Sequence, residues 1–234
     1  GRVRFALRMP PDVFAQAGMV ILAFGVVSAR YGELAAMAKS DVKKMIAYTS
    51  VNHMGYVVIG VAVAALATDP AIRVVALDGA TLQMVSHGIV TGALFFLVGM
   101  LQDRAHSREM GDFGGLLGRV PWLGWAFILS AFASLGLPGL AHFPAEFQIF
   151  LATLNTRPWA VVAILGIVVT AGLYLRAIAA VFLGSDNPGW AAMSDLDRRE
   201  MLVIVPLLVL TILVGIAPGW LLDLIHATMA SLKF

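Results

Sequence analysis

Residues 42–66 read VKKMIAYTSVNHMGYVVIGVAVAAL, and this stretch sets the fold class. After Lys43 and Lys44 it contains no Asp, Glu, Lys or Arg, and it is longer than the roughly 20 apolar residues that an α-helix needs to cross a bilayer. Its apolar positions run continuously instead of alternating, which favours a helix over a strand of a membrane barrel. We therefore predict that this stretch is a membrane-spanning helix.

Five further runs of the same character lie on either side of it. The six predicted spans are 13–38, 42–66, 77–101, 122–154, 159–183 and 201–225. Of the 234 residues, 60% are hydrophobic and only 13% are charged, a composition far from that of soluble globular domains. The sequence thus predicts an all-α integral membrane protein, with a single transmembrane domain over residues 1–234.

The composition also excludes several classes of function. The chain has no Cys, so it offers neither a thiolate ligand for an iron–sulfur cluster nor a redox dithiol. Its formal net charge of +2 is too small to indicate nucleic-acid binding, and its Lys and Arg residues lie mostly between the hydrophobic runs. We expect lipid, and no nucleic acid, around this chain.

The distribution of Lys and Arg predicts an orientation. With six spans, loops 39–44, 102–121 and 184–200 lie on the same side of the membrane. That side carries nine Lys and Arg residues, and the opposite side carries six. Arg176 falls inside a span and is not assigned to either side. The positive-inside rule places the richer side in the cytoplasm.

The fourth span is predicted to be a broken helix. Residues 122–154 are too many for one straight crossing, and GLPG at 136–139 and Pro144 interrupt them. Proline removes a backbone donor and clashes with the preceding turn, so carbonyl groups are freed at membrane depth. Such breaks often mark ion pathways in transporters, although a packing kink would leave the same pattern.

Two histidines fall near mid-membrane: His53 in span 42–66 and His87 in span 77–101. A charged group there costs at least ~2–3 kcal/mol, so ionisable residues at this depth usually face a bundle interior or water and serve a pathway. Histidine also gains and loses a proton readily near neutral pH. We expect both residues to face a common hydrated interior and to relay protons. Neutral histidines bonded between helices, or haem ligands, are the alternatives, and nothing else in the sequence supports haem.

Glu146 is the carboxylate that lies deep in the fourth span, just beyond the predicted break. Burial favours the protonated form of a carboxylate and a nearby cation favours the charged form, so a neighbour's charge would determine whether Glu146 holds a proton. That property suits a proton relay. A carboxylate that caps the second half-helix is the alternative.

Three further ionisable residues each leave two or more roles open. Lys43 lies about ten residues, or roughly 15 Å of helix, from His53, and is either an interfacial anchor or the entrance or exit of the relay. Arg176 lies inside the fifth span, where it either pairs with Glu146 or extends toward the interface. His142 lies within the break itself, so the sequence does not determine its exposure.

A family signature begins at Asp41. The stretch DVKKMIAYTSVNHMG at 41–55 resembles the D-(I/L)-K-(R/K)-x-I-A-Y-(S/T)-S-V-x-H-M-G motif of the antiporter-like subunits of complex I. LQMVSHG at 82–88 and LGLPG at 135–139 are similar to the family's next helix and to its helix break. Glu146 stands where most relatives carry Lys and where the M-type subunit carries Glu, so the chain resembles the M type.

The resemblance covers essentially the whole chain and implies its architecture. It corresponds to the last six helices of a fourteen-helix antiporter-like fold, and because the chain opens at Gly1 without Met we expect a piece of a longer protein. In the M type, the residues that match His53, His87 and Glu146 belong to a polar axis across the membrane. Lys43 matches a family lysine near the membrane edge.

The resemblance also implies a function, that of a proton-translocating membrane subunit of NADH:quinone oxidoreductase. Such a subunit belongs to an enzyme but binds no cofactor or metal itself. NADH, FMN, iron–sulfur clusters and quinone are then expected on partner subunits, which include neighbouring antiporter-like subunits. The implied location is the inner (plasma) membrane of a bacterium. A cation/proton antiporter, or a related energy-converting membrane oxidoreductase, is the alternative, and a passive membrane scaffold is a third hypothesis.

Two departures from the family pattern bear on the local geometry. Asn52 stands where Ser or Thr is commoner, and HFPA at 142–145 replaces the usual Gly-Phe-Val-Gly before Glu146. The second departure falls inside the predicted break, where it bears on the local geometry beside Glu146.

Overall fold

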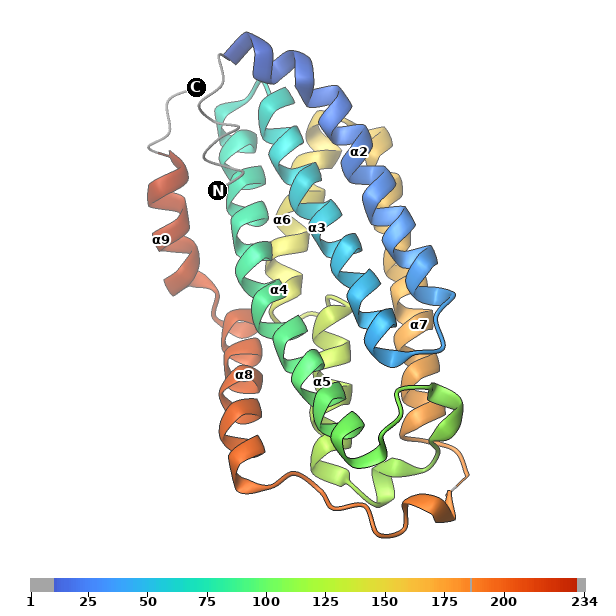
Figure 1. Ribbon diagram of the computed structural model, residues 1–234. Helices are drawn as coiled ribbons and strands as arrows, with labels where there is room; N and C mark the ends of the chain where they lie inside the picture. The colour runs from blue at the N-terminus through green and yellow to red at the C-terminus, as the bar shows by residue number, and fades with distance from the viewer. Residues whose placement is uncertain (1–10, 186, 231–234) are drawn as a thin grey trace.

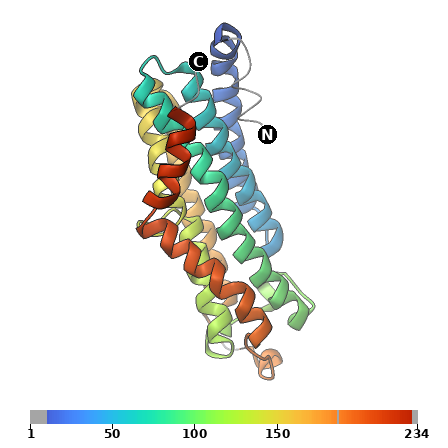
Figure 2. The ribbon, with the colours of Figure 1, turned by 90° about the vertical axis from the view of Figure 1, so that its left-hand side faces the viewer.

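The computed structural model describes residues 11–185 and 187–230, with side chains from residue 16 onward. Within this part of the chain the fold is all-helical, as predicted, and forms an elongated bundle (Figure 1). The α-helices are α2 (Pro11–Met37), α3 (Val42–Leu66), α4 (Pro70–Ala105), α5 (Pro121–Ser134), α6 (His142–Thr156), α7 (Gly166–Val181), α8 (Arg198–Ile216) and α9 (Gly219–Ala230). Short 3₁₀ helices are η1 (Met110–Asp112), η2 (Leu116–Gly118), η3 (Pro158–Leu165) and η4 (Pro188–Trp190). Figure 2 shows α8 and α9 lying along the side of the bundle next to α4.

Local sequence signals explain where the central helices begin. Asp41 caps α3, where its carboxylate accepts a hydrogen bond from the backbone N–H of Lys44 at 3.0 Å. Asp69 caps α4 in the same way, 2.8 Å from the Ala71 nitrogen, and Pro70 occupies the first helical position. Because this cap lies upstream of the apolar run, α4 begins before the predicted span 77–101, and it also continues past the end of that span to Ala105.

Among the described residues, five helices are long and apolar enough to cross a membrane. They are Gln16–Met37, Val42–Leu66, Pro70–Ala105, Pro158–Val181 and Arg198–Ile216. The chain is therefore a multi-pass membrane protein. The sixth predicted crossing needs α5 and α6 together, because 14 and 15 residues are each fewer than the roughly 20 that one helical crossing requires. The count of six remains a prediction.

The structure confirms that the fourth predicted span is broken. Helix α5 ends at Ser134 and α6 begins at His142, and the segment between them turns through Gly136 (φ 77°) and Gly139 (φ 89°). Residues with a Cβ rarely adopt these left-handed conformations, which explains why glycine stands at both positions. The polar residues at the two helix ends thus meet at this turn.

The prediction of one continuous span over 201–225 is wrong. Helix α8 ends at Ile216 and α9 starts afresh at Gly219, because Ala217 and Pro218 interrupt the helix. Pro206 is accommodated inside α8, whereas Pro218 together with Gly219 ends it. The apolar composition continues across this break, which is why hydropathy alone did not reveal it.

Loops 39–44, 102–121 and 184–200 lie at the same end of the bundle, as predicted (Figure 1). The first two pair through backbone hydrogen bonds of 3.0 Å, from Val42 to Arg108 and from Met110 to Ser40. The third joins them where the Trp190 indole donates to the Asp112 carbonyl at 2.8 Å. The assignment of this end to the cytoplasm remains a prediction, and residues 2, 4, 8 and 233, which entered the charge count, lie outside the described residues.

Glycines let α2 and α3 approach each other closely. A Cβ on Gly32 would lie 2.5 Å from the Asn52 backbone nitrogen, and a Cβ on Gly55 would lie 2.6 Å from that of Ala29. Small residues at such positions allow the backbones of membrane helices to pack together. The approach brings the second half of α2 against the polar part of α3.

Two apolar clusters enclose that polar part. On α3, Met45 and Ile46 belong to one cluster, and Tyr56 and Ile59 belong to the other. Buried polar side chains occupy the positions between them, among them His53. The core is therefore apolar toward both ends of the bundle and polar near the middle of α3.

Candidate functional site

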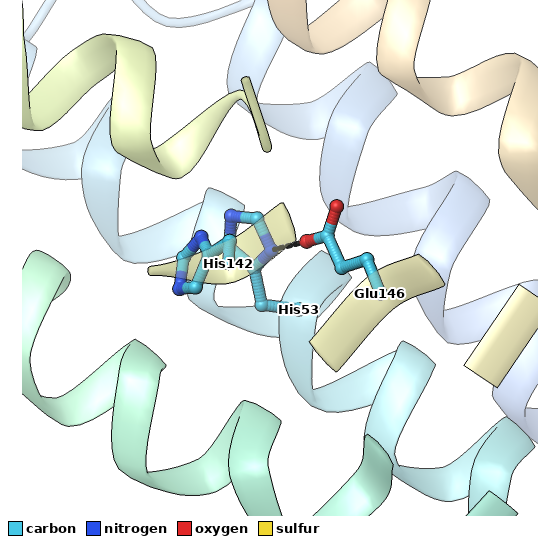
Figure 3. Close-up of side chains that lie close together, drawn as sticks. All are labelled: His53, His142 and Glu146. Atoms are coloured by element: carbon cyan, nitrogen blue, oxygen red, sulfur yellow. Dashed lines mark hydrogen bonds and ion pairs between the residues drawn. The ribbon is translucent and has the colours of Figure 1, made fainter. Parts of the chain in front are cut away.

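The centre of the site is a contact between His53 on α3 and Glu146 on α6 (Figure 3). His53 Nδ1 lies 3.2 Å from Glu146 Oε1, and the two residues are only 1% and 4% exposed. The other ring nitrogen, Nε2, lies 3.0 Å from the hydroxyl of Ser134, the last residue of α5. The histidine thus touches both halves of the broken helix.

One face of α3 supplies most of the polar groups. Thr49, Asn52, His53 and Tyr56 are buried and follow the i, i+3, i+4, i+7 spacing of one helical face. The Thr49 hydroxyl lies 3.3 Å from the Tyr174 hydroxyl, which itself donates to Ser134 Oγ at 2.8 Å. Side chains from α3, α5 and α7 therefore form a continuous hydrogen-bonded group.

The helix break positions Glu146. A Cβ on Gly136 would lie 2.6 Å from Glu146 Oε2, so glycine makes room for the carboxylate in the turn. From α4, the Gln83 side-chain amide donates to Glu146 Oε1 at 3.1 Å and lies 3.4 Å from His53 Nδ1. Three elements thus fix the carboxylate beside the imidazole.

Two more histidines adjoin this pair. The His142 ring, fully buried at the start of α6, lies 4.4 Å from the His53 ring between centroids, and the His87 ring lies 5.3 Å from it. His87 and His142 stack at 5.9 Å, and the Thr91 hydroxyl lies 3.1 Å from His87 Nδ1. His53 and His87 thus lie side by side, with His87 only partly buried, and His142 joins them. The hydration of this interior and its role in proton transfer remain predictions.

Several buried polar atoms at this site lack a hydrogen-bond partner among the described residues. They are Asn52 Oδ1, Gln83 Oε1, Ser86 Oγ and His142 Nε2. Buried polar atoms of this kind are normally bound by ordered water. They therefore favour the expected hydration of the interior.

The donor set of His53, His142 and Glu146 also bears on metal binding. Their nitrogen and oxygen ligand atoms all lie within 4.8 Å of one another, a combination that zinc accepts. However, both His53 nitrogens already face hydrogen-bond partners, Glu146 and Ser134. The arrangement is a hydrogen-bonded cluster, in which a metal would have to displace existing contacts.

Two residues singled out from the sequence lie apart from this group. Lys43 is exposed in the first turn of α3, roughly 15 Å of helix from His53. Arg176 does not pair with Glu146, since its guanidinium donates to the carbonyl of Lys39 at the loop end of the bundle. That contact agrees with the second expectation for Arg176, which was extension toward the interface.

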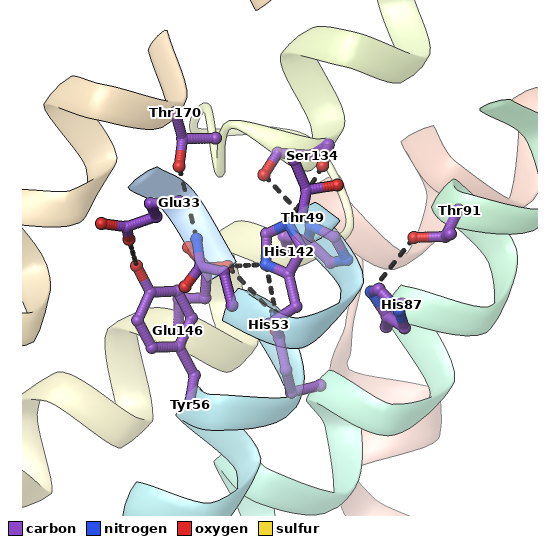
Figure 4. Close-up of polar contacts among 12 residues, drawn as sticks. Glu33, Thr49, His53, Tyr56, His87, Thr91, Ser134, His142, Glu146 and Thr170 are labelled. Atoms are coloured by element: carbon purple, nitrogen blue, oxygen red, sulfur yellow. Dashed lines mark hydrogen bonds and ion pairs between the residues drawn. The ribbon is translucent and has the colours of Figure 1, made fainter. Parts of the chain in front are cut away.

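Sequence reasoning missed a second buried carboxylate, Glu33 on α2. It is fully buried, accepts a hydrogen bond from the Tyr56 hydroxyl at 3.1 Å and lies 3.3 Å from the Arg30 guanidinium. In Figure 4, Glu33 and Tyr56 lie on one side of His53, and His87 and Thr91 lie on the other. The signal that could have revealed Glu33 is Gly32 beside it, which allows the close helix contact described above.

The comparisons with known proteins identify the family. A model of the family described as NADH:quinone oxidoreductase/Mrp antiporter, transmembrane, matches residues 2–173. The chain is 36% identical over 233 residues to NADH-quinone oxidoreductase subunit M of Pseudomonas aeruginosa, covering 98% of this chain and 43% of that protein. It is 32% identical to the subunit of the same name from Escherichia coli K12, covering 100% and 45%. The chain therefore spans less than half the length of these curated relatives, and its resemblance to the M type is confirmed.

Solved structures give the same result. The chain superposes on a chain of respiratory complex I from Thermus thermophilus with a TM-score of 0.87 at 30% identity, covering 98% of this chain and 48% of that one. It also shares its fold with a chain of the Mrp complex from Dietzia sp. DQ12-45-1b, with a TM-score of 0.79 at 23% identity over 94% and 48%. This chain belongs to the NADH:quinone oxidoreductase/Mrp antiporter transmembrane family.

Proposed function

We propose that this chain is part of an M-type membrane subunit of NADH:quinone oxidoreductase and that it relays protons through His53, His87, His142 and Glu146. The observation that carries the proposal is the buried contact between His53 and Glu146 at the helix break. A charge at this depth is costly unless it is paired, so a histidine and a carboxylate retained together there point to a pathway.

The geometry of His53 suits proton transfer. Its two ring nitrogens face different partners, Glu146 Oε1 at 3.2 Å and Ser134 Oγ at 3.0 Å. An imidazole can accept a proton on one nitrogen and release one from the other, so the ring can pass a proton between these groups. When the proton resides on Glu146 both groups are neutral, and when it moves to His53 the two charges remain adjacent. Neither state leaves an isolated charge in the core.

The energy for transport must come from outside this chain. A Cys-free chain cannot hold iron–sulfur clusters, so NADH, FMN, these clusters and quinone are assigned to partner subunits of the complex. Partners that bind differently to two states of the relay would shift its proton affinity. We place the complex in the plasma membrane of a bacterium, since the relatives named above are bacterial. The shared fold alone does not distinguish this function from cation/proton antiport, but the carboxylate at 146 favours the M type.

The test is Glu146→Gln in the full-length subunit within its assembled complex. The substitution keeps the size of the side chain and removes its exchangeable proton. We expect proton pumping and coupled quinone reduction to fall at least about tenfold, while electron transfer from NADH to an artificial acceptor persists. Glu146→Asp, which keeps the carboxyl group, should lose less. Normal assembly of Glu146→Gln with pumping at the wild-type rate would contradict the proposal.

A further inference from the structure

Glu33 is a buried carboxylate that the relay described above does not use. It lies on α2, fully buried, whereas the relay residues come from α3, α4 and α6. Its Oε1 accepts a hydrogen bond from the Tyr56 hydroxyl at 3.1 Å, and its Oε2 lies 3.3 Å from Arg30, whose side chain is 33% exposed. Burying a carboxylate costs free energy unless neighbouring groups pair with it, so the surroundings of Glu33 must accommodate and bind it.

That environment is formed by glycines on both sides of the carboxylate. Gly166, at the first position of α7, has no Cβ, and a Cβ there would overlap the Glu33 carboxylate itself. Gly32 allows α2 to rest on the backbone at Asn52. The carboxylate therefore fills a pocket between α2, α3 and α7 and does not extend from a helix end.

The Glu33 pocket adjoins the central site through α3. Tyr56 lies one turn from His53, and their rings meet edge to face at 6.0 Å between centroids (Figure 4). Asn52 lies beside the Glu33 carboxylate, donates to Thr170 at 3.3 Å, and precedes His53 in the chain. Its Oδ1 is buried without a partner among the described residues, so the boundary between the two sites has a polar atom that can bind water.

We propose that Glu33 is a second proton-binding carboxylate, which exchanges protons with the His53–Glu146 pair through Tyr56 and Asn52. This inference rests on the proposed function and adds to it an end point of the relay on the α2–α7 side. In each transfer, an O–H bond forms on Glu33 as one breaks on Tyr56. Tyr56 then takes a replacement proton from the His53 side through water bound at Asn52.

The charges around Glu33 support a proton that resides alternately on Glu33 and on Glu146. The charged group of its own helix is Arg30, and Glu146 on α6 acts on Glu33 by repulsion. On α3, Tyr56 donates a hydrogen bond to Glu33 and Asn52 lies beside the carboxylate, while α7 contributes Gly166 at the contact. Two carboxylates that repel each other inside one core do not both ionise readily, so a proton that leaves one favours protonation of the other.

A double-mutant cycle on pumping by the full complex tests the inference. The variants are Glu33→Gln, Tyr56→Phe and the combination of both, with protons pumped per electron measured in assembled complexes. We expect Glu33→Gln to lower this ratio at least about threefold and Tyr56→Phe to lower it less. The double variant should pump as many protons per electron as Glu33→Gln alone, because both changes interrupt the same step. Additive losses would contradict this route.

The matched control is Asp78→Asn. Asp78 is another buried carboxylate, on α4, and it pairs with His226 at 2.6 Å outside the relay. The Asp78→Asn substitution should leave the number of protons pumped per electron unchanged. A loss as large as that of Glu33→Gln would overturn the inference, because it would show that any buried carboxylate is needed. If Glu33→Gln fails to assemble, Glu33→Asp replaces it and should retain part of the pumping.

The outcomes also distinguish this inference from the proposed function. Impaired pumping in Glu146→Gln together with wild-type pumping in Glu33→Gln and Tyr56→Phe would overturn the role of Glu33 and leave the central relay standing. Wild-type pumping in Glu146→Gln would contradict the proposed function itself.

Discussion

The chain interrupts two of its helices with proline and glycine, and the two breaks differ in their surroundings. The break between α5 and α6 is flanked by buried polar side chains, Ser134, His142 and Glu146. The break between α8 and α9 is flanked by Ile216 and Trp220, which are 71% and 53% exposed. Similar residues break both helices, so the break itself does not create a functional site. The two breaks differ in the polar groups that converge on the first and are missing from the residues flanking the second.

The two breaks are nevertheless in contact. Gly215, near the end of α8, lies against the backbone of Gly139 and Leu140, and a Cβ on Gly215 would overlap those atoms. The apolar break therefore supports the polar one from outside. The comparison predicts that substitutions at the first break change function and stability, whereas substitutions at the second act through stability.

The largest effect is expected from Gly136→Ala. Its φ of 77° strains any residue with a Cβ, and that Cβ would lie 2.6 Å from Glu146 Oε2, so the carboxylate that contacts His53 must shift. The matched control is Gly139→Ala, where φ is 89° but no atom lies within 4 Å of the added Cβ. Both should lose about 1–2 kcal/mol of stability to backbone strain, and only Gly136→Ala should also lose pumping. Equal pumping in the two variants would show that Glu146 does not depend on the turn.

An effect on stability alone, with pumping retained, is expected from Gly215→Ala. The added methyl group must displace the backbone at Gly139, which costs about 1–3 kcal/mol in a closely packed interior. Gly219→Ala, at the start of α9, is the control, because no atom lies within 4 Å of its added Cβ. Thermal unfolding of the purified complexes would measure the difference. A Gly215→Ala variant as stable as Gly219→Ala would show that the two breaks do not support each other.

The smallest loss of stability is expected from Ser134→Ala. It removes the acceptor of the Tyr174 hydrogen bond and the partner of His53 Nε2, at a cost of about 0.5–1.5 kcal/mol. Ser130→Ala is the control on the same helix, because the Ser130 hydroxyl bonds only the Ala126 carbonyl among the described residues. We expect Ser134→Ala to slow pumping and Ser130→Ala to leave it unchanged. The proposed route through His53 would lose its support if both variants pumped alike.

Much of the site could be predicted from the sequence, because its signals are local. His53, His87 and Glu146 stand out as ionisable residues in apolar runs, and GLPG at 136–139 indicates the break. The prediction for 201–225 failed because hydropathy continues through Pro218.

Glu33 was missed because its burial is not local. It lies near the end of its span and four residues before Met37, where a carboxylate normally reaches water. Only the approach of α3 at Gly32 and of α7 at Gly166 encloses it. His142 was undetermined for the same reason, since its exposure depends on how the turn folds.

The most direct test of this account is whether Glu146 changes its protonation during turnover. The measurement is the infrared difference spectrum of the assembled complex between its oxidised and reduced states, recorded for the wild type, Glu146→Gln and Asp78→Asn. The account predicts a carboxylic-acid C=O band that is present in the wild type and in Asp78→Asn and absent in Glu146→Gln. Identical carboxyl bands in all three complexes would mean that Glu146 holds no exchanging proton and would contradict the proposed relay.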